Sequence, residues 1–216
     1  MNKLLLALPL LFLAPAVAEA KRTPPKATAS QGMISAADPR AAAAGVEILR
    51  KGGSATDAAI ATMLALNVVE PQSSGIGGGS FMVYHDATSG KLASFDGREQ
   101  APAAADEKWF YGADGKPLPV FSAIPGGRSV GVPGNIRMMA LAHQRYGKLP
   151  WATLFGPAIK LARDGFAVSP RLHGGIGNYG RHIDPWAKAH FFGPDGKAVP
   201  TGTILKNPEQ AALFSA

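Results

Sequence analysis

The feature that most constrains this fold is a helical segment at residues 55–69 that is apolar on every side. Ser54 and Asp57 have capping-box spacing, with Asp in place of the usual Glu or Gln, which predicts a helix starting at Ala55. Apolar residues surround the helix instead of forming one stripe, so it is expected to be buried on all sides. Pro71 ends it. We therefore expect an interior helix that needs packing layers on both sides.

A glycine-rich stretch follows directly, PQSSGIGGGSFMVYH at residues 71–85. It lacks the lysine of a phosphate-binding loop, the third glycine of a dinucleotide fingerprint, and a serine flanked by glycines as in a nucleophile elbow. Glycine tolerates positive φ and lets backbones approach closely. We therefore interpret Gly75–Gly79 as a close-packed turn between the buried helix and the strand at residues 81–85.

Other elements follow from local patterns. Asp38 and Pro39 predict a helix start, and the pair Gly52–Gly53 predicts its end. Strands are predicted at residues 32–37, 81–85, 91–95 and 198–205, with a turn at 86–90 joining the second and third. Helices are predicted at residues 133–146 and 157–164 and from 207 onward. Residues 101–120 are expected to be irregular, and the pattern of 171–182 gives no assignment.

The N-terminus resembles an export signal. A positive start and an apolar run from Leu4 to Leu13 precede small-x-small cleavage patterns, which predicts a signal peptide over residues 1–20. The mature chain would begin near Glu19 or Lys21. Residues 21–31 are polar and proline-rich, as in a disordered linker. With no cysteine in the chain, a bacterial periplasm suits the exported protein better than a small disulfide scaffold, although secretion also fits. No second apolar run of this kind follows, so we predict no membrane segment in the chain that remains after signal cleavage.

Charge and histidine placement exclude several classes of site. The formal net charge is +7 without a dense basic stripe, so no nucleic-acid partner is predicted. A close histidine–carboxylate pair such as His182 with Asp184 supplies two ligands, whereas a zinc site needs three or four. We therefore predict no metal and no cofactor.

Three segments, in order, resemble one known family. They are AAGVEILRKGGSATDAAIATMLALNVVEPQSSGIGGGSFMVY, FDGREQAP, and the block from PGGRSVGVPGNIRMMALAHQRYGKLPW to LARDGFAVS. Together they resemble the gamma-glutamyltranspeptidases (glutathione hydrolases). The resemblance runs from Gly32 to the C-terminus and covers the N-terminal part of the large subunit, so residues 32–216 are expected to be that part.

The resemblance implies an α+β fold, the αββα sandwich of N-terminal nucleophile hydrolases, of which this chain would hold only the N-terminal portion. Members are exported precursors that cut themselves to expose a threonine at the start of a small subunit. That threonine attacks the γ-glutamyl carbonyl of glutathione, and its own α-amine can serve as the base. Water or an amino-acid or peptide acceptor then takes the γ-glutamyl group. The partners implied are glutathione or another γ-glutamyl substrate, the acceptor, and the small subunit from the same precursor.

One site residue carries over from the family. In Asp96-Gly97-Arg98-Glu99, Arg98 matches the arginine that binds the α-carboxylate of the γ-glutamyl group. A guanidinium fork can meet a carboxylate with two charge-assisted hydrogen bonds. The structural alternative is an ion pair of Arg98 with Glu99 or Asp96.

The self-cleavage motif Thr-Thr-His is absent, so no catalytic residue is predicted here; the nucleophile is expected beyond the chain end. A helix that begins at residues 207–209 has only just started when the sequence ends at Ala216. We therefore expect a truncated sequence that is inactive alone. Two other interpretations are open: a related cephalosporin or polyglutamate acylase of the same fold, and a non-catalytic exported binding module.

Overall fold

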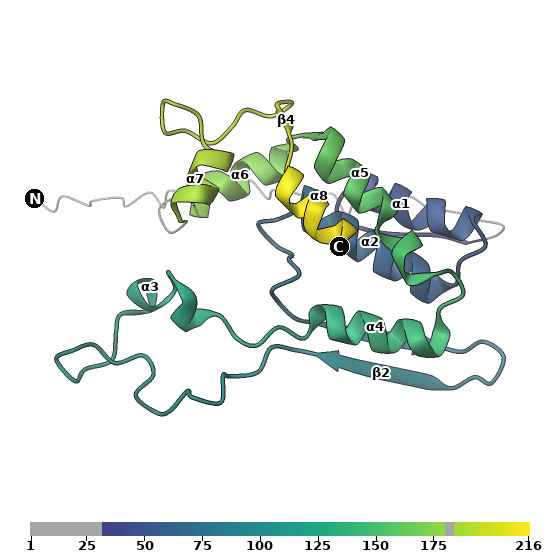
Figure 1. Cartoon of the computed structure of the whole chain (residues 1–216), viewed down its shortest axis with the longest axis horizontal. Helices are drawn as coiled ribbons and strands as arrows, with labels where there is room; N and C mark the ends of the chain where they lie inside the picture. The colour runs from purple at the N-terminus through teal and green to yellow at the C-terminus, as the bar shows by residue number, and fades with distance from the viewer. Residues whose placement is uncertain (1–31, 180–183) are drawn as a thin grey trace, which may run out of the picture. The chain divides into compact units, whose positions relative to one another are not determined.

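The computed structural model describes residues 32–179 and 184–216 (Figure 1). The predicted signal peptide and linker lie outside these residues. In chain order the elements are α1 (Pro39–Arg50), α2 (Ala55–Val69), β1 (Ser80–His85), β2 (Leu92–Gly97), α3 (Val120–Ala123), η1 (Gly127–Ser129), α4 (Asn135–Tyr146), η2 (Trp151–Phe155), α5 (Gly156–Asp164), β3 (Phe166–Ala167), α6 (Pro170–Tyr179), α7 (Pro185–Phe191), β4 (Ile204–Leu205) and α8 (Pro208–Ser215). This mixture of helices and antiparallel strands is the α+β class that the sequence predicts.

Helix α2 begins and ends where the sequence predicts, and its capping box is complete. The Asp57 backbone N–H donates to the Ser54 hydroxyl oxygen at 3.1 Å, and the Ser54 N–H donates to Asp57 Oδ2 at 2.8 Å. The helix packs against α1, α4, η2 and α5. Ile60, Leu64 and Val69 have no exposed surface. The interior position is confirmed, and helices of this same chain supply most of the cover.

The core extends outward from α2 to both ends of the described chain. Ile48 of α1, Met139 of α4 and Leu154 of η2 are fully buried, and Phe214 of α8 joins the same cluster. In the part of the chain that the structure describes, no helix combines the length and apolar character needed to cross a membrane.

The predicted hairpin is present, with its second strand displaced by one or two residues. Strands β1 and β2 pair antiparallel, from Ser80 opposite Gly97 to His85 opposite Leu92, and α4 runs along β2 (Figure 1). Phe95 is buried on the α4 side. Phe81, Val83 and Leu92 point to the opposite face and are 66%, 73% and 71% exposed. An exposed apolar surface therefore lies on this face of the hairpin, whereas no large apolar side chain of α2 is exposed.

Some local predictions were wrong or incomplete. Residues 32–37 form no strand, because their short apolar pattern has no partner strand to complete a ladder. Within 198–205 only β4 is a strand; it pairs with β3, and Pro200, which has no N–H, interrupts the preceding residues. Helix α4 starts two residues later than predicted. Helix α6 occupies most of the stretch left unassigned, whereas α5 and α8 begin within a residue of prediction.

Candidate functional site

Arg98 lies one residue beyond the end of β2, in a turn that its neighbours fix. Its backbone N–H donates to Asp96 Oδ1 at 2.9 Å. Its Nη1 donates to Glu99 Oε2 at 2.7 Å, and the Arg98 side chain remains 65% exposed. The ion pair that the sequence offered as the structural alternative is therefore formed. It engages one side of the guanidinium, and the planar group has further N–H donors for a ligand.

A cavity of about 540 Å³ opens beside this turn and contains charges of both signs. Arg98 and Arg128 line it together with Glu99 and Asp106. The indole N–H of Trp109 donates to the Arg128 carbonyl oxygen at 2.7 Å, which fixes the Arg128 backbone in the cavity wall. Such a cavity suits a small ligand that carries both a carboxylate and an ammonium group.

The glycine stretch packs against the same turn, but the tight fit is at one glycine. A β-carbon on Gly79 would lie 2.6 Å from both Glu99 Oε2 and the Gly97 carbonyl oxygen; one on Gly78 would lie 3.3 Å from Glu99 Oε1. Gly75 and Gly77 have open space around them. None of these four glycines has positive φ. The predicted close-packed turn is therefore confirmed at Gly79, where close approach and not positive φ requires the glycine.

Two buried polar residues that the sequence analysis did not single out hold this stretch. Glu70, 2% exposed, accepts from Arg171 Nε at 2.6 Å and from Gln72 Nε2 at 2.9 Å. Asn135, 3% exposed, donates from Nδ2 to the Gly75 carbonyl oxygen at 2.9 Å. A charged residue directly after an all-apolar helix was a visible signal for Glu70. Asn135 gave no such signal, because its partners lie about 60 residues away in sequence.

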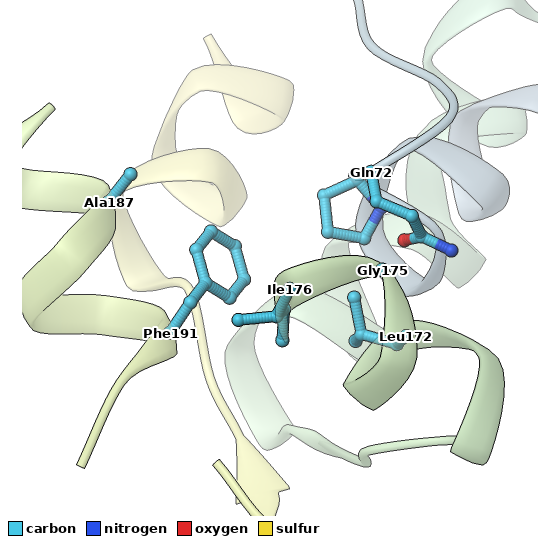
Figure 2. A pocket seen from close by; sticks show the side chains of 7 residues that line it. Gln72, Leu172, Gly175, Ile176, Ala187 and Phe191 are labelled. Atoms are coloured by element: carbon cyan, nitrogen blue, oxygen red, sulfur yellow. The ribbon is translucent and has the colours of Figure 1, made fainter. Parts of the chain in front are cut away.

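A second cavity, of about 290 Å³, has a different character (Figure 2). Leu172 and Ile176 of α6 and Phe191 of α7 point into it beside Gln72. Among the residues that the structure describes, no charged side chain lines it, so this lining does not suit a zwitterionic ligand. In residues 32–179 and 184–216 no group of three or more His, Cys, Asp and Glu side chains could hold a metal ion.

Comparison with known proteins places these features in one family. The family model described as Gamma-glutamyltranspeptidase matches residues 41–216. Scoloptoxin SSD14 of Scolopendra dehaani is 50% identical over 167 residues, which are 76% of this chain and 27% of the relative. Glutathione hydrolase 3 of Arabidopsis thaliana is 44% identical over 183 residues, which are 83% of this chain and 28% of the relative. The chain thus spans less than a third of the length of these curated relatives.

A solved structure agrees with the sequence comparison. The crystal structure of Helicobacter pylori gamma-glutamyltranspeptidase superposes with a TM-score of 0.81 at 31% identity, and the match covers 88% of this chain and 54% of that one.

Proposed function

The chain belongs to the gamma-glutamyltranspeptidase family, and from that premise we propose that it is the part of such an enzyme that binds the γ-glutamyl group of glutathione and related compounds. The observation that carries the proposal is Arg98 at the rim of the charged cavity, held by the turn after β2 and still 65% exposed. Its free N–H donors would meet the α-carboxylate of the γ-glutamyl group as a fork.

The chemistry we propose is acyl transfer without metal or cofactor. A threonine hydroxyl outside these 216 residues attacks the γ-carbonyl and gives its proton to the α-amine. The α-amine passes this proton to the amide nitrogen, so that the C–N bond breaks, the peptide leaves as a neutral amine, and the γ-glutamyl group stays on the threonine as an ester. Water or an amino-acid or peptide acceptor then cleaves the resulting ester and regenerates the threonine. The threonine would begin a small subunit of the same precursor. We also propose export after signal removal, which N-terminal sequencing of the exported protein would test at Glu19 or Lys21.

Ligand binding to the chain tests the assignment of Arg98. The probe is γ-glutamyl-p-nitroanilide, and the matched ligand is 4-aminobutyryl-p-nitroanilide, which keeps the amine and lacks only the α-carboxylate. Calorimetry is expected to show tighter binding of the γ-glutamyl compound. Arg98→Lys should remove most of that preference, because the ammonium cannot form the fork; a lost charged hydrogen bond is worth about 1.5–3 kcal/mol, about ten-fold or more in affinity.

Arg163→Lys is the matched control. Arg163 is also 65% exposed and also pairs with the next residue, Asp164, but it lies on α5 and does not line the charged cavity. Its substitution should leave both affinities unchanged. Equal binding of the two anilides by the parent chain would show that the α-carboxylate is not recognised, which would contradict the proposed role of Arg98. A γ-glutamyl preference that persists in Arg98→Lys would show that Arg98 does not bind the α-carboxylate.

Turnover needs the rest of the enzyme. A hybrid precursor in which residues 41–216 replace the matching segment of Arabidopsis thaliana Glutathione hydrolase 3 should process itself and release p-nitroaniline from the γ-glutamyl anilide. The 216-residue chain alone should not, since no threonine in it matches the nucleophile. Normal processing of the hybrid without γ-glutamyl turnover would favour the binding-module interpretation.

A further inference from the structure

Asn135, the first residue of α4, makes hydrogen bonds to three residues of the glycine stretch and β1. Its Oδ1 accepts from the Ser80 hydroxyl at 2.7 Å, its Nδ2 donates to the Gly75 carbonyl oxygen at 2.9 Å, and its backbone N–H donates to the Gly78 carbonyl oxygen at 3.2 Å. Because the side chain is buried, the Ser80 hydroxyl and the Gly75 carbonyl oxygen would both lose this partner if the amide were removed, whereas the backbone bond to Gly78 would remain.

These bonds are not an ordinary helix cap. The N-cap position of α4 is Gly134, which makes no side-chain hydrogen bond. By contrast, Asn207 at the start of α8 accepts from the N–H of Gln210 within its own helix. The amide of Asn135 reaches residues 55 and 60 positions away. Its role is therefore to join α4 to the glycine stretch, not to begin the helix.

The first turn of α4 also contacts the backbone that carries Arg98. A β-carbon on Gly134 would overlap the Gly97 carbonyl oxygen and lie 3.0 Å from the Arg98 carbonyl oxygen. A β-carbon on Gly97 would lie 2.5 Å from Met138 Cβ. Backbone therefore packs on backbone here, and a shift of α4 must move the turn at residues 96–99.

The glycine stretch reaches Arg98 by a second route, through Glu99. Gly79 packs against both the carboxylate and the backbone N–H of Glu99, and Gly131 packs against its Cβ. The same carboxylate accepts from Arg98 Nη1. A displacement of the stretch would thus move the anion that orients the guanidinium.

We infer that Asn135 is a positioning residue for substrate binding: by locking the glycine stretch to the first turn of α4, it sets the place and direction of the Arg98 guanidinium. The inference rests on the proposed function of Arg98. It adds that binding depends on a buried amide that need not contact the ligand.

The experiment compares Asn135→Ala with Asn207→Ala, which removes an asparagine side chain from another helix start. Two measurements are made on the 216-residue chain: amide hydrogen exchange at residues 97–99 without ligand, and the Kd for γ-glutamyl-p-nitroanilide. Asn135→Ala should speed exchange at these amides about ten-fold and raise Kd about ten-fold, whereas Asn207→Ala should change neither, even where it lowers stability equally.

Ser80→Ala keeps the test decisive if Asn135→Ala does not fold. It removes one of the three bonds, so a smaller change in the same direction is expected in both measurements. Unchanged exchange and Kd in both Asn135→Ala and Ser80→Ala, or equal changes in Asn207→Ala, would overturn the inference. Failure of the parent chain to bind the anilide would contradict the proposed function instead, and the exchange data would still decide whether Asn135 orders the Arg98 turn.

Discussion

Asp57→Asn tests whether one buried carboxylate connects the start of α2 to the loop that follows α4. Asp57 has no exposed surface. Its Oδ2 accepts three backbone N–H bonds, from Ser54 at 2.8 Å, Lys148 at 2.9 Å and Leu149 at 3.1 Å. The capping box thus also holds the loop after α4, more than 90 residues further on. Asparagine has nearly the same shape, so the substitution changes charge without leaving a large cavity.

The expected loss follows from the three bonds. A hydrogen bond to a charged group contributes about 1.5–3 kcal/mol and a neutral one about 0.5–1.5 kcal/mol, so each bond weakens by about 1 kcal/mol. Relief of the cost of burying the charge offsets part of the sum. We therefore expect Asp57→Asn to lower the free energy of unfolding by about 2 kcal/mol at pH 7.

The pH dependence separates this mechanism from a simple packing defect. Burial raises the pKa of Asp57, but the hydrogen bonds from Ser54, Lys148 and Leu149 lower it by more, so the net pKa is below its ordinary value. A lowered folded-state pKa adds stability above the unfolded value, about 3.9, and that stability is lost as the pH falls through the folded value. The difference in the free energy of unfolding between parent and variant (the stability gap) should therefore have its full size at pH 7 and become progressively smaller below about pH 4.

Urea unfolding followed by circular dichroism, from pH 7 down to pH 3, measures this gap. Asp184→Asn is the control, because Asp184 also caps a helix with two N–H bonds but is exposed; its effect should be clearly smaller. A gap for Asp57→Asn that keeps the same size at pH 3 and pH 7 would refute the charge-based reasoning. A variant as stable as the parent would show that the three bonds contribute nothing net.

Two further predictions concern the glycine stretch and the hairpin. Gly79→Ala should destabilise the chain by about 1–3 kcal/mol, since its methyl group meets backbone atoms that cannot yield, whereas Gly77→Ala, with open space, should be neutral or slightly stabilising in the same urea assay. Replacing Phe81 and Val83 by serine and threonine should slow aggregation in light scattering without lowering stability, because both side chains lie on the exposed hairpin face; unchanged aggregation would exclude that face as its cause.

Local patterns predicted the elements whose determinants lie close together in sequence. Three such features are present: the capping box of α2, the proline at the start of α1 and the antiparallel hairpin. Each depends on residues that are near one another in the sequence. The family resemblance predicted the α+β class of the N-terminal nucleophile hydrolases, and the superposition at a TM-score of 0.81 confirms it.

The remaining features depend on partners that no local pattern specifies. The four glycines are equivalent in the sequence, and only the close approach of Glu99 and of the Gly97 carbonyl oxygen distinguishes Gly79 from Gly77. The amide of Asn135 and the second set of bonds to Asp57 likewise join loops far apart in the chain. The strand predicted at residues 32–37 failed for the same reason, since strand formation depends on a partner as well as on propensity.

The placement of Arg98 explains why the glycines matter to the site. A side chain that is 65% exposed gains little orientation from packing around it, so its precision has to come from its backbone and its single ion pair. That backbone is enclosed by Gly79 and Gly134, whose missing side chains let the glycine stretch and α4 approach the turn at residues 96–99 directly. Any side chain at either position would displace the turn, and the guanidinium with it. Under the proposed function, the stretch that lacks the motifs of a phosphate loop and of a nucleophile elbow would thus position Arg98 through close contact, which is why Gly79→Ala should weaken γ-glutamyl binding as well as folding, whereas Gly77→Ala should weaken neither.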